Sequence, residues 1–119
     1  GKIQTIITSK APDTLYDAVD LMPEFYGGGA ELTQFLIENL KYPEAESAAK
    51  IEGKVVVQFT IDQTGAIGDV KAVRIPAQGE NLGKEAVRVV RSMPKWKPGK
   101  QAGKPVKVNY TLPVDFKLK

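Results

Sequence analysis

The side chains in this sequence that could take part in chemistry are carboxylates and hydroxyls, because histidine and cysteine are both absent. Histidine is the commonest general base and a common metal ligand, and thiolates hold most structural zinc ions. The carboxylates considered are Glu24, Glu44, Glu46 and Glu52, and the candidate nucleophiles are Ser9, Ser47 and Ser92. No general base accompanies these serines, and the carboxylates lack partners at metal-ligand spacing. We therefore predict no catalytic residue, no metal site and no cofactor, and expect a binding module rather than an enzyme.

The charges divide the chain into an acidic and a basic half. Residues 1–53 carry a net charge of −5 and residues 54–119 a net charge of +8, which together give +3. A basic half can attract nucleic acid or an acidic partner, but it can equally be a solvated face. The cations concerned are Arg88, Arg91, Lys95, Lys97 and Lys100.

Trp96 stands among these cations, where it could stack on a base. We favour instead a large aromatic side chain that closes one end of the core, and we predict no nucleic-acid partner. Nucleic-acid binding stays as an alternative hypothesis, which salt-dependent retention on DNA would test.

The length of 119 residues suits one domain, with residues 1–29 as a lead-in and residues 30–119 as the compact part. Residues 3–14 indicate a strand-like start and a turn, and residues 15–22 a possible short strand before Pro23. No apolar run is long enough to cross a bilayer. Gly1 and Lys2 resemble the remnant of a cleaved tag, so we expect targeting and anchoring segments upstream.

Three segments have helical periodicity. Residues 30–40 place Leu32, Phe35, Leu36 and Leu40 on one face. After the interruption at Tyr42 and Pro43, a short helix is expected over residues 44–51, with Pro43 at its first position and Gly53 as its stop. A third helix is expected from Asn81, as its cap, to Met93, before Pro94.

Three further segments alternate like strands. Residues 54–62 and 66–75 form a predicted hairpin around a turn at 62–65, with a β-bulge near Gly68 and Asp69. Residues 106–118 alternate apolar and polar side chains without a fault. The order of elements predicts an α+β fold, with an antiparallel sheet of three or slightly more strands and helices packed on one face.

The last strand points to a function because it contains Pro113. Proline donates no hydrogen bond, so within a sheet it is confined to an edge or a bulge. An edge strand exposes N–H and C=O groups that can pair with another chain, either by design or by accident. The strand is therefore interpreted as an edge strand. Two interpretations remain open: a guarded edge that only closes the sheet, or a docking site for a partner peptide.

The sequence resembles the C-terminal domain of TonB proteins, in the form typical of Bacteroidetes. The resemblance covers residues 22–118 and rests on the order and spacing of short motifs. These are Met22-Pro23-Glu24-Phe25, Tyr42-Pro43, the stretch 51–59, the turn 62–65, Asp69-Val70, Glu85-Ala86, Met93 to Lys100 with its Trp-Lys-Pro-Gly-Lys block, and the stretch 103–116.

The resemblance implies a TonB/TolA-like fold and a periplasmic domain anchored in the inner membrane by an N-terminal helix. The implied function is to capture the TonB-box peptide of outer-membrane transporters by β-strand addition. Force from an inner-membrane complex of the ExbB/ExbD type would then pass to the transporter plug. The residues implied for peptide binding are Val106, Lys107, Val108, Asn109, Tyr110, Thr111 and Leu112, with Tyr42 and Pro43 as a secondary contact. We expect the segment before Pro113 to bind the partner, and the segment after it to serve the fold.

An alternative hypothesis makes the chain the TonB-like tail of a membrane signalling or antirepressor peptidase, where it would act as an interaction module. The sequence upstream of Gly1 would distinguish the two. An open edge strand could also pair with its own copy, so a strand-exchanged homodimer is possible.

Overall fold

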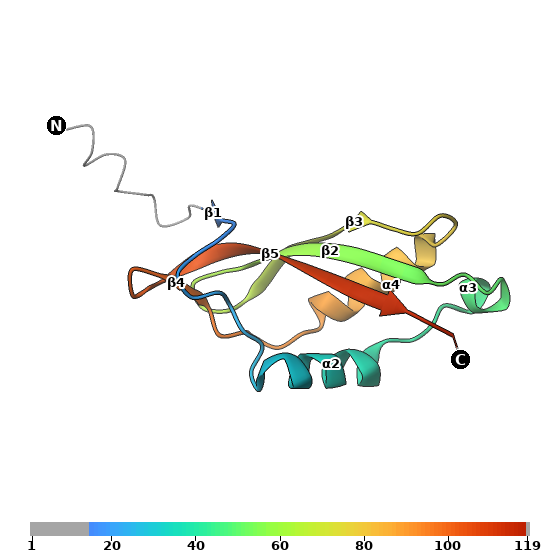
Figure 1. The fold of residues 1–119 in the computed structure, drawn as a ribbon, viewed down its shortest axis with the longest axis horizontal. Coiled ribbons are helices and arrows are strands. Elements are labelled where there is room, and N and C mark those ends of the chain that lie inside the picture. Colours follow the sequence, from blue (N-terminus) through green and yellow to red (C-terminus); the bar gives the residue numbers. More distant parts are fainter. Residues whose placement is uncertain (1–14, 119) are drawn as a thin grey trace.

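The fold is built around strand β2, which lies between its hairpin partner and the last strand of the chain (Figure 1). The computed structural model describes residues 15–118. Within them the strands are β1 (Leu15–Tyr16), β2 (Gly53–Ile61), β3 (Ile67–Arg74), β4 (Gly99–Gln101) and β5 (Lys104–Phe116), and the helices are α2 (Gly28–Asn39), α3 (Glu44–Ala48) and α4 (Glu80–Arg91). The lead-in predicted over residues 3–14 lies outside the described residues.

The sheet has the strand order β1-β5-β2-β3, and β4 pairs with β5. β2 is antiparallel to both β3 and β5, as predicted, whereas β1 pairs with β5 in the parallel direction. The prediction of an α+β fold with three or slightly more strands is confirmed; the sheet has five strands, and the parallel β1 makes it mixed. The two strands that were not predicted as part of the sheet are short: β1 has two residues and β4 has three.

The core lies on one face of the sheet. Alternate side chains of β2, from Val55 to Ile61, are fully buried there, as are Val108 and Val114 of β5. Helix α4 contributes Leu82, Ala86 and Val90 to the same core, and α2 packs against it through partly buried side chains. Both helices therefore cover the same face (Figure 1). Burial of this alternating set is the main stabilising term of the sheet.

Trp96 occupies the centre of an aromatic cluster in this core. It is 1% exposed and contacts Phe25, Phe59 and Tyr110 with ring centroids 5.0–5.6 Å apart. The prediction of a core aromatic residue is confirmed. A buried ring has no free face for a nucleic-acid base, so stacking by Trp96 is excluded.

Helix α4 begins differently from the prediction. Asn81 is the second residue of the helix and not its cap. Its backbone N–H and its side-chain amide both donate to the buried carboxylate of Glu46 on α3, at 2.8 and 3.3 Å. A carboxylate from another helix therefore satisfies the start of α4, a contact between distant residues that local sequence does not reveal.

Helix α3 is shorter than predicted. It ends at Ala48, and Lys50 follows in the left-handed region, with a φ of 56°. Gly53 therefore begins β2 instead of ending the helix. Pro43 is the residue before the helix, where its fixed φ and missing N–H are tolerated.

The hairpin of β2 and β3 agrees with the prediction. The turn is held by the carboxylate of Asp62, which accepts hydrogen bonds from the backbone and hydroxyl of Thr64 and from the N–H of Ala66. These bonds, the one from the Thr64 hydroxyl first, lower the pKa of Asp62. The register shifts between Gln58 and Thr60, opposite Asp69, so the predicted bulge is confirmed.

Candidate functional site

Strand β5 is paired along only part of its length on the side away from β2. On the β2 side the register is continuous, from Gly53 opposite Phe116 to Ile61 opposite Val108. On the other side β1 pairs with Lys107 and Val108. Among the described residues no strand continues this pairing along residues 109–116. We call this unpaired stretch the free edge of β5.

The position of Pro113 shows which backbone groups point outward. Opposite residues of an antiparallel pair alternate between exchanging both hydrogen bonds and exchanging none. Pro113 lies opposite Val56 and has no N–H. Because the register between the two strands is not interrupted there, Pro113 and Val56 must be a pair that exchanges no hydrogen bonds. Thr111 and Asp115 share this alternation, and their N–H groups therefore face away from β2. The free edge thus combines outward donors with the outward carbonyl of Pro113.

An apolar groove runs beside the free edge. It measures about 400 Å³ and lies between β5 and the second half of α2. The helix contributes Leu36, Ile37 and Leu40, and the strand contributes residues 113–117. Ile37 is 68% exposed, which is high for an isoleucine on a helix that packs on a core. A strand added to β5 would place alternate side chains over this groove.

Tyr42 closes one end of this groove. Its ring meets Phe116 edge-on at a centroid distance of 5.7 Å, and its hydroxyl donates to the carbonyl of Ile51. Partial burial first, and then the charges of Glu52 and Glu46, raise the pKa of Tyr42. The phenol is therefore neutral over the physiological range and serves as a donor. Tyr42 therefore links the end of β5 to the segment that precedes β2.

The structure separates the two parts of the predicted peptide site. Tyr42 and the neighbouring Pro43 lie near Phe116, at the far end of β5 from Val106. Val106 pairs with Gly99 of β4, and Lys107 and Val108 pair with β1. Within the segment 106–112 that was predicted to dock a peptide, Lys107 and Val108 are already paired with β1 on the side away from β2. Of the predicted residues, Asn109, Tyr110, Thr111 and Leu112 lie on the free edge.

The first residues of the free edge are partly shielded. The side-chain amide of Asn109 donates to Asp17 at 3.2 Å, just after β1. After this contact the chain leaves β5, and residues Leu21 and Glu24 form isolated bridges with Lys100 and Lys97. Beyond residue 109, β5 pairs only with β2 among the described residues, and its other side has no strand partner.

The opposite edge of the sheet is built differently. The register between β2 and β3 shifts twice, once at Asp69 and once at Val73 of β3. Bulges interrupt the regular row of donors and acceptors that an added strand needs. The straight register of β5 has no such interruption. Of the two sheet edges, β5 is therefore the one suited to strand addition.

The described residues offer no cluster of side chains that could hold a metal ion. No group of three or more acidic, histidine or cysteine side chains comes together in residues 15–118 in a way that could hold a metal ion. Glu46 is engaged with Asn81, and Glu85 is engaged with Arg88 at 2.7 Å, a pairing that lowers the pKa of Glu85. These carboxylates serve the fold.

The family model described as the Gram-negative bacterial TonB protein C-terminal matches residues 38–118. The matched range runs from the end of α2 to the end of β5, and so includes the whole free edge. The chain belongs to the TonB C-terminal domain family. No curated protein matches the chain.

Membership in the TonB C-terminal family fixes the broad character of the protein. The family is non-enzymatic, in agreement with the prediction from composition. TonB C-terminal domains are typically periplasmic and interact with TonB-dependent transporters, so this chain is an interaction domain of the energy-transduction type. No helix within residues 15–118 is long and apolar enough to span a membrane.

Sequence reasoning missed the groove beside the free edge and the cover over its first part. A signal for the groove was present: Ile37 lies next to the predicted apolar face of α2 and widens it toward β5. The loose alternation over residues 15–22 did indicate a possible short strand, and β1 lies within it, but no local signal indicated that it pairs with Lys107 and Val108 of β5.

Proposed function

We propose that this TonB C-terminal domain captures the TonB-box peptide of an outer-membrane transporter by β-strand addition to the free edge of β5. The observation that carries the proposal is the unpaired stretch 109–116, in continuous register with β2 and flanked by the α2 groove. An incoming extended peptide would find backbone partners on β5 and an apolar surface for every second side chain.

The expected strength follows from the number of backbone bonds. Each contributes about 0.5–1.5 kcal/mol net, so five or six bonded groups give a few kcal/mol in total. Burial of one or two aliphatic side chains in the groove adds about 1.5–3 kcal/mol each before the cost of ordering the peptide. The result is a weak to moderate affinity, which suits a contact that must be made and released.

Extension of the captured strand toward Val106 requires β1 to leave. β1 pairs through two residues only, Leu15 opposite Lys107 and Tyr16 opposite Val108. So short a pairing contributes little stability, and a longer peptide could replace it. We propose that the contact starts on residues 109–116 and extends to residues 106–108 when β1 is displaced. Tyr42 and Pro43 would contact the other end of the peptide.

Membership in the family also supports a proposal for the wider role of the domain. An N-terminal membrane helix would anchor the domain in the inner membrane, and a proton-driven complex of the ExbB/ExbD type would act through it. Force along the tether would pass through the added strand to the transporter plug. Strand pairing suits this role, because its many weak bonds are loaded together when the pull is along the strand.

Titration of the isotope-labelled domain with a synthetic TonB-box peptide tests the proposal. We expect the largest amide shifts at residues 109–116, with side-chain methyl shifts at Leu36 and Ile37. Amides on the opposite edge, such as those of Lys71 and Val73, serve as an internal control and should stay still. Shifts on another surface with none at residues 109–116 would show that the peptide does not dock on β5.

A further inference from the structure

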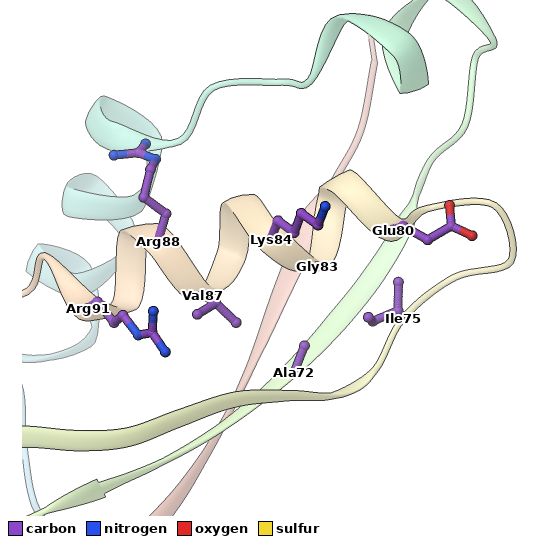
Figure 2. A pocket seen from close by; sticks show the side chains of 8 residues that line it. All are labelled: Ala72, Ile75, Glu80, Gly83, Lys84, Val87, Arg88 and Arg91. Carbon is purple, nitrogen blue, oxygen red and sulfur yellow. The ribbon is translucent and has the colours of Figure 1, made fainter.

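A second groove lies at the β3 edge of the sheet, between helix α4 and the end of β3 (Figure 2). It measures about 560 Å³, larger than the groove beside the free edge of β5. Its lining includes Ala72 and Ile75 from the sheet side and Gly83 and Val87 from the helix. We call it the α4–β3 groove. Nothing in the proposed capture of a peptide on β5 uses this surface.

The floor of the α4–β3 groove is aliphatic and open. Figure 2 shows Ala72, Ile75 and Val87 facing the same space between helix and strand. Gly83 lets Ile75 pack close against the helix, since a Cβ atom there would lie 2.6 Å from Cδ1 of Ile75. Ile75 is 42% exposed. Exposed aliphatic side chains gathered in a hollow are typical of a protein contact surface.

The rim of the groove carries two cations that are available for a partner. Lys84 and Arg91 both lie on exposed positions of α4, and neither forms an ion pair within residues 15–118. Arg88, between them, is engaged instead: it bonds the carboxylate of Glu85 at 2.7 Å and the carbonyl of Asn39 at 2.9 Å. Figure 2 shows Arg88 directed away from the groove. Glu80, the acidic lining residue, lies at the start of α4, one turn before Lys84.

The shape of β3 decides how an occupant can bind. The register of β3 against β2 shifts at Asp69 and at Val73, and these shifts break the row of backbone groups on this edge. A strand could not be added in regular register. Recognition must therefore come from side chains, namely aliphatic groups over Val87 and Ile75 and carboxylates beside Lys84 and Arg91. The two cations are seven residues apart on the helix, or about 10 Å along its axis.

We propose that the α4–β3 groove binds a segment of a partner protein that carries aliphatic side chains together with carboxylates. The aliphatic groups pack on the floor of the groove. The carboxylates, about 10 Å apart, pair with Lys84 and Arg91. The domain thus has two separate contact surfaces: β5 binds by its backbone, and the α4–β3 groove binds by side chains.

Selection from a random library of 16-residue peptides on the immobilised domain tests this proposal. We expect a class of enriched peptides rich in Leu, Ile, Val, Asp and Glu, whose affinity falls as salt is raised. The double variant Lys84→Glu/Arg91→Glu should bind this class at least tenfold more weakly. The matched control Lys95→Glu/Lys100→Glu makes the same change in net charge away from the groove and should change affinity by less than twofold.

A second pair of variants tests the apolar floor. Val87→Asp should abolish binding of the acidic class, whereas Val73→Asp, on an exposed neighbour outside the groove, should leave it intact; circular dichroism checks that each is folded. Amide shifts with one selected peptide should centre on Ala72, Gly83 and Val87. The proposal is overturned if every enriched peptide maps to β5. It is also overturned if the peptides that bind in the groove contain no more Asp and Glu than the starting library. Amide shifts at the groove that depend on protein concentration in the absence of peptide would also overturn it, because they would show that a second copy of the domain occupies the groove.

Discussion

Replacing Thr111 with proline would block the free edge of β5 while leaving the sheet intact. Thr111 is exposed and lies opposite Gln58, two residues before Pro113 in the same continuous register. By the alternation of the ladder, its N–H faces away from β2, as the nitrogen of Pro113 does. The substitution should therefore remove no bond between β2 and β5.

The effect on peptide capture has two parts. An added strand would lose one N–H donor, which is worth about 0.5–1.5 kcal/mol net. The proline ring would also project into the path of the strand, at a steric cost of roughly 1–3 kcal/mol. Together these amount to about 1.5–4.5 kcal/mol and predict binding of a TonB-box peptide that is weaker by about 10-fold to 2,000-fold.

Calorimetric titration with the peptide measures this change, and urea unfolding checks that stability stays within about 0.5 kcal/mol of the wild type. Thr111→Val is the matched control, because it keeps the N–H and should change affinity by less than about twofold. Leu112→Pro is the opposite control: its N–H faces β2, so the variant should lose about 3 kcal/mol of stability. A folded Thr111→Pro domain that binds as tightly as the wild type would refute strand addition here. An unfolded one would refute the assigned direction of the N–H.

Three further predictions concern the contacts that hold the site in place. Glu46→Ala should lower the free energy of unfolding by about 1–3 kcal/mol in urea, because the start of α4 loses a buried acceptor, whereas Glu46→Gln should lose less. Gly65→Ala should cost about 3 kcal/mol or more, since φ is +90° and a Cβ would lie 1.9 Å from the carbonyl oxygen of Trp96; Gly103→Ala, with φ +78° and open space, should cost only about 1 kcal/mol. The pKa of Asp62 is lowered in the folded state, so its contribution to stability is present above about pH 4 and is lost as the pH falls through the folded pKa. Urea midpoints of Asp62→Asn should therefore vary less than those of the wild type between pH 5 and pH 2, and an equal dependence would contradict the assignment.

The sequence by itself determined the elements whose signals are local. Alternation along β2, β3 and β5 reflects burial of one sheet face, and a one-residue slip would expose the whole apolar set, so the pattern fixes which side chains face the core. The turn at 62–65 and the bulge at Asp69 follow from side-chain hydrogen bonding and backbone freedom within a few residues. Composition alone excluded an enzyme built on histidine or cysteine, and the order of motifs indicated the family.

Only the tertiary structure decided how much of β5 is open. Two residues of β1 cover Lys107 and Val108, and such a pairing depends on contacts between positions about 90 residues apart that carry no local signal. The same holds for Glu46 at the start of α4, 35 residues away in sequence, and for both grooves. A proline in the last strand indicated an edge. The edge became a stretch of defined length and direction only when the packing of α2, β1 and Tyr42 around it was known, because backbone groups are open or closed by whichever segment folds against them.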